Sequence, residues 1–187
     1  VQNNNIGVAW DGTTAVGNSV CGILLSGADD ALIGGYDQSS SNRIAHNAIG
    51  IGLKYTTTSA LRNRILGNSI YLNTNQGIDL GLNNSIVPND GLINSTEDNH
   101  GLDYPEIASA LNCDLSETII TYDLSVPIGF NYRVEFFTNT SPDPLNGEGE
   151  TLLGFQTVTT SSNPQTFTYN TGSLITIGTS ISATVTS

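Results

Sequence analysis

Three basic side chains in the first half of the chain have the chemistry that binding or processing of an acidic polysaccharide would need. Arg43 and Arg64 each follow an asparagine in two similar short segments, and His46 lies in the first of them. A guanidinium binds carboxylates in a planar, two-pronged geometry, and histidine exchanges a proton near neutral pH. We therefore treat Arg43, His46 and Arg64 as candidate glycan-facing residues. Solvated turn residues are the simpler interpretation.

A carboxylate-bearing loop in the second half has ligands suited to calcium. Asp143, Glu148 and Glu150 lie among proline and glycine residues, and Ca²⁺ takes six to eight oxygen ligands. Their spacing matches neither an EF-hand loop nor a Gly-Gly-x-Gly-x-Asp repeat. The three residues are a candidate Ca²⁺ site, with a plain solvated loop as the favoured alternative. The sequence requires no cofactor.

Motifs of the common enzyme classes are absent from the sequence. His46 and His100 are the only histidines, and their spacing resembles no zinc site. No Gly-x-Ser-x-Gly segment is present to form a nucleophile elbow. A glycoside hydrolase needs two facing carboxylates, and in the first half only Asp79 falls on an expected strand. The sequence therefore predicts no catalytic residue and a protein that is not an enzyme, with a polysaccharide lyase or hydrolase as the alternative.

Two further residue types invite covalent modification. Cys21 and Cys113 are the only cysteines and form a candidate disulfide, with separate small buried side chains as the alternative. The candidate N-glycosylation acceptors are Asn84, Asn94 and Asn139.

Composition favours an all-β chain. Charged residues make up 12% of the 187 residues, hydrophobic residues 37%, and methionine is absent. The usual builders of helix surfaces are therefore scarce, whereas asparagine, serine, threonine and glycine are abundant. Such a composition predicts short strands separated by many turns.

The net charge of −12, with only five lysines and arginines, excludes several partners. Phosphate backbones and anionic membrane surfaces would be repelled, so we expect neither nucleic-acid binding nor membrane insertion. No run approaches 18 apolar residues. The opening residues lack the pattern of a signal peptide. The chain is expected to be a mature product or a piece of a longer protein.

A repeated pattern in the first half predicts the architecture. Residues 42–47 read NRIAHN and residues 63–68 read NRILGN, an offset of 21 residues (63 − 42). Short apolar pieces bounded by asparagine or glycine recur between them, as in the coils of a parallel β-helix. Equivalent asparagines should then stack and share amide hydrogen bonds, and equivalent isoleucines should stack in the core. With this period Arg43 and Arg64 should share one face.

Two stretches of the chain resemble a known family. The runs GNSIYL at residues 67–72 and GIDLG at 77–81 resemble coils of secreted microbial β-helix repeat surface proteins. YRVEFF at 132–137 and GEGETLLG at 147–154 resemble the β-sandwich module that often follows such coils. The resemblance implies a pectate-lyase-like right-handed parallel β-helix, followed by that module. The resemblance also implies that members which cleave acidic polysaccharides place aspartate, arginine, lysine or histidine on one outer face, usually with Ca²⁺.

The texture of the sequence changes near residue 82. Residues 83–102 are polar and aperiodic, which predicts a linker or loop. Beyond them, six longer strand-like runs between 106 and 186 favour an immunoglobulin-like antiparallel β-sandwich. The expected organisation is therefore a short right-handed parallel β-helix at 1–82, a linker at 83–102, and the sandwich at 103–187.

The expected function follows from the two ends of this arrangement. A β-helix that begins inside a coil exposes unpaired backbone groups and apolar core, which another chain or domain must cover. Val1, Ile6, Ile181 and Val185 are the candidate assembly contacts. We expect an extracellular or cell-surface structural or adhesive protein, a subunit of a fibre or filament joined end to end by strand pairing. Its partners would be other copies or adjoining domains of a longer surface protein. The alternative is a protein that binds or processes glycans on the β-helix flank.

Overall fold

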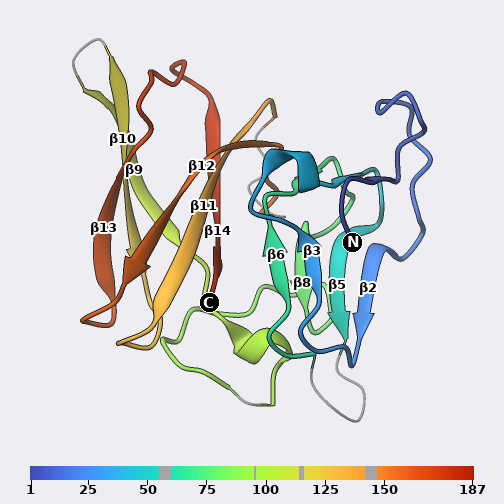
Figure 1. Cartoon of the computed structure of the whole chain (residues 1–187), viewed down its shortest axis with the longest axis horizontal. Coiled ribbons are helices and arrows are strands. Elements are labelled where there is room, and N and C mark those ends of the chain that lie inside the picture. Colours follow the sequence, from blue (N-terminus) through green and yellow to red (C-terminus); the bar gives the residue numbers. More distant parts are fainter. Residues whose placement is uncertain (55–59, 95, 114–115, 142–146) are drawn as a thin grey trace.

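The computed structural model describes residues 1–54, 60–94, 96–113, 116–141 and 147–187. Strands hold 45% of the chain and helices 4%, so the prediction of an all-β protein is confirmed. The helical residues form two short 3-10 turns, Gln38–Ser40 and Asp98–Gly101. None of the helices in the described ranges has the length and apolar character needed to cross a membrane. Figure 1 shows two lobes lying side by side.

The first lobe, here called the parallel lobe, is built from three small parallel sheets. Their strand orders are β1-β4-β7, β2-β5-β8 and β3-β6. The chain visits the sheets in this same sequence on each pass, and one such pass is here called a winding. The strands are β1 Asn5–Ile6, β2 Cys21–Ser26, β3 Leu32–Gly34, β4 Arg43–Ala45, β5 Ile49–Lys54, β6 Arg64–Leu66, β7 Ser69–Tyr71 and β8 Ile78–Leu80.

The predicted register of the windings is wrong. Arg43 pairs with Ser69, so residues 42–47 stack on the segment that begins at Asn68, an offset of 26 residues. Arg64 pairs instead with Leu32 in another sheet. The two similar segments therefore lie at different corners of one winding. They look alike because each corner requires the same elements: an asparagine, a short strand with an inward isoleucine or leucine, and a tight turn.

Asparagine side chains follow one corner of the parallel lobe from winding to winding. The Oδ1 of Asn42 accepts hydrogen bonds from the backbone N–H and the Nδ2 of Asn4, both at 3.1 Å. The Oδ1 of Asn68 accepts the equivalent bonds from Asn42 at 3.2 and 2.8 Å. Each amide thus satisfies two donors of the preceding winding, as buried polar groups require. We call these three residues the first asparagine ladder.

A second asparagine ladder follows the next corner. The Oδ1 of Asn47 accepts from the backbone N–H and the Nδ2 of Asn18 at 3.1 and 2.8 Å. The Oδ1 of Asn73 accepts from Asn47 in the same manner at 3.0 and 3.1 Å. Asn42 and Asn47 are fully buried. The expectation that stacked asparagines share amide hydrogen bonds is confirmed, in the corrected register.

Stacked aliphatic side chains fill the interior of the parallel lobe. Ile44 pairs with Ile70 and Ile51 with Ile78, so equivalent residues lie over one another. Their cluster also contains Ile33, which is 1% exposed. Gly34, between a strand and a turn, has a φ of +77°, and a side chain there would collide with the Leu66 carbonyl and the Asn68 amide. Only glycine allows that close approach.

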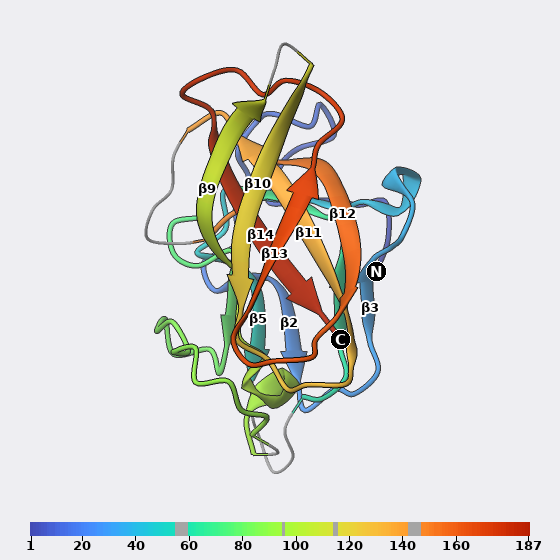
Figure 2. The same cartoon turned by 90° about the vertical axis from the view of Figure 1, so that its left-hand side faces the viewer.

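The second lobe, here called the antiparallel lobe, consists of two three-stranded antiparallel sheets (Figure 2). Their orders are β13-β10-β9 and β12-β11-β14. Buried and half-buried residues alternate along β10, which places Ile120, Tyr122 and Leu124 in the shared core. The Phe136 ring lies 4.5 Å from Tyr169 in a stacked pair that joins the sheets. The strands are β9 Glu106–Cys113, β10 Glu117–Leu124, β11 Asn131–Asn139, β12 Thr151–Thr159, β13 Gln165–Asn170 and β14 Ser180–Thr186.

The described residues between β8 and β9 form no strand, but they cover one edge of the parallel lobe. The Oδ1 of Asn99 accepts the backbone N–H of Asn63 at 2.9 Å, and its Nδ2 donates to the Asn63 carbonyl at 2.8 Å. The carboxylate of Asp98 accepts the Ala60 N–H at 2.7 Å. The side chains of this segment therefore bind the backbone groups that a further winding would otherwise pair with.

Removal of one ladder amide should lower the free energy of unfolding far more than removal of a surface amide. Asn47→Ala removes an acceptor for Asn18 and donors to the next winding, leaving buried groups unpaired, so we expect a loss of about 2–4 kcal/mol. Asn5→Ala, in exposed strand β1, is the matched control and should change stability little. Urea unfolding followed by circular dichroism measures both. Equal losses in the two variants would contradict the ladder's role.

Candidate functional site at the junction of the lobes

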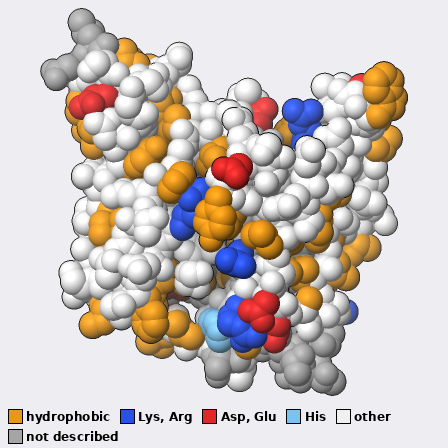
Figure 3. All heavy atoms as spheres, in the orientation of Figure 1, with side chains coloured by type: hydrophobic (Ala, Val, Ile, Leu, Met, Phe, Trp, Pro, Cys, Tyr) orange, Lys and Arg blue, Asp and Glu red, His pale blue; other side chains and the backbone are white. Residues whose placement is uncertain are grey.

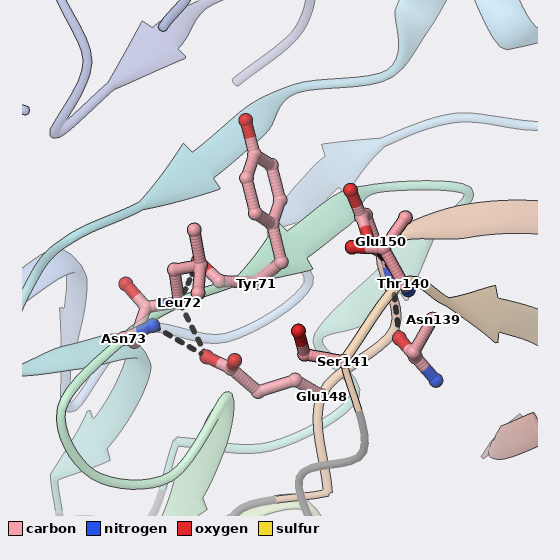
Figure 4. A pocket seen from close by; sticks show the side chains of 8 residues that line it. All are labelled: Tyr71, Leu72, Asn73, Asn139, Thr140, Ser141, Glu148 and Glu150. Atoms are coloured by element: carbon pink, nitrogen blue, oxygen red, sulfur yellow. Dashed lines mark hydrogen bonds between the residues drawn. The ribbon is translucent and has the colours of Figure 1, made fainter. Parts of the chain in front are cut away.

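The second asparagine ladder ends on a carboxylate of the other lobe. Glu148 Oε1 accepts the backbone N–H of Asn73 at 2.9 Å and its Nδ2 at 2.8 Å. These are the two bonds that each ladder Oδ1 accepts from the winding before it. Glu148 is 5% exposed. The carboxylate therefore stands where the next asparagine of the ladder would lie (Figure 4).

Backbone groups next to Glu148 also take the place of a further winding. The Ile70 N–H of β7 donates to the Gly149 carbonyl at 2.7 Å, within an antiparallel bridge between the two residues. β7 is the last strand of its parallel sheet. Ser182 Oγ of β14 donates to the Glu148 carbonyl at 2.6 Å, which ties this segment back to the antiparallel lobe. The antiparallel lobe thus covers the end of the stacked windings.

A buried ion pair forms a second junction contact. Arg133 Nε donates to Glu135 Oε1 at 2.8 Å, and Glu135 Oε2 accepts the Gly67 N–H at 2.8 Å. The side chains of Arg133 and Glu135 are 11% and 2% exposed. The guanidinium lies 3.4 Å from the centre of the Phe155 ring and 5.2 Å from that of Tyr36, a residue of the parallel lobe. Arg133 and Glu135 therefore bind both lobes together.

A small polar pocket of about 220 Å³ lies beside Glu148 (Figure 4). Tyr71 and Asn73 form one side, and Glu150 forms part of the other. Glu150 Oε2 accepts the Thr140 N–H and Oγ1–H at 2.8 and 2.7 Å. Both carboxylates in the pocket are therefore already hydrogen-bonded within the protein.

Two of the three calcium candidates, Glu148 and Glu150, hydrogen-bond within the protein beside this pocket, and a Ca²⁺ site there stays a prediction. Glu148 and Glu150 line the same pocket, whereas Asp143 lies outside the described residues. Within the ranges that are described, no group of three or more His, Cys, Asp or Glu side chains is arranged to hold a metal ion.

A larger groove of about 1020 Å³ separates the lobes on another side. One wall comes from β6 and β8 and includes Arg64 and Ile78; the opposite wall is β14. Arg62 at the rim binds Asp30 through two hydrogen bonds of 2.8 Å. This pairing lowers the pKa of the Asp30 carboxyl and raises the pKa of the Arg62 guanidinium. We call this space the lobe groove; Figure 3 shows it as a hollow with basic and histidine side chains beside it.

The candidate glycan-facing residues are not brought together. Arg43 lies in β4, where its Nη1 donates to the Gly12 carbonyl at 3.0 Å. His46 occupies the following turn with a φ of +61°, edge-on to Tyr71 at 6.4 Å. Arg64 lies in a different sheet and faces the lobe groove. The expectation that Arg43 and Arg64 share one face is wrong because it rested on the 21-residue register.

The two cysteines are free thiols. Cys21 belongs to β2 in the parallel lobe and Cys113 to β9 in the antiparallel lobe, so the candidate disulfide is not formed. Burial is the main cause that raises the pKa of the Cys21 thiol, with a contribution from Asp79. A thiol held in its protonated form is a weak nucleophile and metal ligand.

The candidate glycosylation acceptors differ in environment. The triplet assigned to Asn84 begins at Asn83, because the required serine, Ser85, follows two residues after Asn83, so Asn84 itself is wrong. Asn94 is exposed. Asn139 is engaged, since its Oδ1 accepts the Glu150 N–H at 2.8 Å and its Nδ2 donates to Ser182 at 3.1 Å.

The candidate assembly contacts comprise one exposed residue and three that pack against a core. Val1 is 56% exposed, although its carbonyl accepts the Gly34 N–H at 2.8 Å beside β3. Ile6 is half-buried against the core of the parallel lobe. Ile181 and Val185 pack against the core of the antiparallel lobe, so their side chains are not free for a partner.

Several junction residues escaped the sequence analysis. Glu135 and Gly149 were part of expected strands and loops without a role, and Glu148 was expected in a solvated loop with Ca²⁺ binding as the less favoured possibility. A usable signal existed for the ladder itself, because asparagines recur 26 residues apart at 42 and 68 and at 47 and 73. No family model matches the chain, so a function must be argued from this geometry.

Replacement of Glu148 should show whether its hydrogen-bond acceptor or its negative charge stabilises the protein. Glu148→Ala leaves two buried donors of Asn73 unpaired, and we expect a loss of about 2–3 kcal/mol in unfolding free energy. Glu148→Gln keeps a carbonyl oxygen at the same reach and should lose less than half as much. Glu106→Ala, at an exposed position of β9, is the control. A Gln variant as unstable as the Ala variant would show that the charge matters and the acceptor does not.

Proposed function

We propose that the chain is a structural module of an extracellular surface protein: a short right-handed parallel β-helix whose last coil is closed by a β-sandwich. The observation that supports it best is the substitution of Glu148 and Gly149 for a further winding. Covering of an end is a property of stacked, solenoid-like architectures, whose terminal repeats must hide apolar and backbone groups from water. The resemblance to secreted β-helix repeat proteins supports the same assignment.

Buried amide ladders suit a load-bearing role. Asn42, Asn47, Asn68 and Asn73 are at most 5% exposed, and the bonds of each of the two ladders run along the stacking direction. Hydrogen bonds shielded from water face little competition from solvent, and networks of them rigidify a structure when every member is satisfied. A stiff stack held by uncharged amides, in a chain with a net charge of −12, is suited to a stalk or spacer outside the cell.

The opposite edge of the parallel lobe offers the partner surface. In its sheet β2 pairs only with β5, so its other edge has no strand beside it among the described residues. Leu24 on β2 is 46% exposed, and Val16 and Val20 before it are 56% and 57% exposed. The Oδ1 atoms of Asn4 and Asn18 accept no hydrogen bond within the described ranges. A further winding, from an adjoining domain or another copy, would supply apolar contacts and N–H donors here.

This geometry refines the proposed fibre. The last winding is covered by the antiparallel lobe, so strand pairing would use the β2 edge alone, and growth into a fibre would need a second, different contact surface. Parallel sheets leave such edges ready to pair, and natural proteins protect them with charged residues or a cover.

Glycan binding or processing remains the second candidate function. The lobe groove supports it with Arg64, His100 and the ring of Tyr104. Against it, the Asp30 carboxylate at the rim of the groove is already bound to Arg62. A screen of neutral glycans and polyuronates, with and without Ca²⁺, distinguishes the two functions. Release of unsaturated sugars would favour a lyase and overturn the structural assignment.

A charge on the open edge should abolish self-association. Leu24→Lys places a lysine on edge strand β2, which discourages strand pairing, whereas Ile177→Lys changes a loop residue that is 91% exposed. In sedimentation equilibrium we expect the wild-type protein and Ile177→Lys to associate reversibly with rising concentration, and Leu24→Lys to stay monomeric. Electron microscopy would show whether the associated form is a fibre. Wild-type protein that is monomeric at every concentration would remove the fibre and leave only the role within a longer protein.

A further inference from the structure

The outer edge of β14 is an unpaired strand edge inside the lobe groove. β14 pairs with β11 on one side only, and no other strand lies beside it among the described residues. Residues 181–187 all line the groove. Alternate N–H and C=O groups of an edge strand point away from its neighbour, so this wall presents backbone donors and acceptors in a row.

Side chains on β14 leave that edge accessible. Ile181, Ala183 and Val185 turn inward and pack against the core of the antiparallel lobe. Of the residues between them, Ser182 donates to the Glu148 carbonyl within the antiparallel lobe, and Thr186 Oγ1 donates to the Ile65 carbonyl of the parallel lobe at 3.4 Å. The groove-facing side chains of β14 are thus small and hydroxylated, and they do not fill the space.

The facing wall carries an unbalanced positive charge. Two of the five lysines and arginines and one of the two histidines line the groove, in a chain of net charge −12. Arg62 is neutralised by Asp30, whereas Arg64 takes part in none of the ion pairs found in the described ranges. Glu106 is the acidic residue on the antiparallel side of the groove. Arg64 is therefore an available partner for a carboxylate.

We propose that the lobe groove binds an extended peptide that adds to β14 as a further antiparallel or parallel strand. Side chains of an added strand alternate between its two faces. One face would meet Leu102 and Ile107 at the antiparallel lobe, and the other would meet Arg64 and His100. The partner is thus a segment in which apolar and acidic residues alternate. This inference goes beyond the structural role proposed above and does not depend on it.

Pairing of β14 with the β14 of a second folded copy does not fit this site. Its own β14 is recessed in the same groove, with β6 and β8 standing opposite. Two recessed strands cannot approach each other, because the parallel lobes would collide first. An unfolded segment of a partner protein is free of that restriction.

Fluorescence anisotropy with a labelled seven-residue peptide of alternating glutamate and valine tests the proposal. We expect saturable binding to the wild-type chain, and a loss of about tenfold or more in affinity for Arg64→Glu, since an ion pair is turned into a repulsion. Lys54→Glu makes the same charge change outside the groove and should bind as the wild type does. Thr184→Trp, which fills the groove, should abolish binding, whereas Thr168→Trp on exposed β13 should not.

The same peptide N-methylated at alternate residues separates strand addition from charge attraction. It keeps every side chain but loses N–H donors, so one of its two methylation registers should fail to bind. Equal binding of both registers would overturn the proposal, as would equal weakening by Arg64→Glu and Lys54→Glu. An acidic oligosaccharide that binds through Arg64 while the peptide does not bind would also overturn it, in favour of a glycan. Circular dichroism spectra identical to that of the wild type show that each variant is folded.

Discussion

A buried amide must find a partner for both its donor and its acceptor, and this requirement organises the whole molecule. Inside the parallel lobe, the Oδ1 of a ladder asparagine accepts hydrogen bonds from the winding before it. Its own N–H groups donate to the Oδ1 of the winding after it. Such a chain of bonds has no natural end. Leaving the last donors of Asn73 unpaired away from water would cost about 1–3 kcal/mol for each group. The stack therefore needs a terminator.

The antiparallel lobe supplies that terminator from strands far along the chain. Glu148 lies 75 residues from Asn73, and Glu135 lies 68 residues from Gly67. Both carboxylates accept N–H groups of the last winding, and Arg133 holds Glu135 in place between two aromatic rings. The two lobes are consequently joined by buried polar contacts, and the lobe groove is the space left where they diverge.

Particular residues show how far the sequence could predict this structure. Asparagine, glycine and isoleucine placed at the corners were sufficient to predict stacked short strands with shared amides, and the strand-like runs between 106 and 186 predicted strands that are present, β10 among them. The register failed because Asn42 and Asn63 satisfy the same local rules at different corners. The bonds from Asn73 to Glu148 were not predicted because a ladder's end has no local signature. The role of Glu148 depends on a contact that only the folded chain creates.

The coupling between Asn73 and Glu148 tests the account most directly. A double-mutant cycle with Asn73→Ala, Glu148→Ala and the double variant isolates their interaction from other effects of each change. If the carboxylate ends the ladder, the two losses in unfolding free energy will be strongly non-additive, with a coupling of about 1–3 kcal/mol. Losses that add within about 0.5 kcal/mol would show two independent sites and contradict the account.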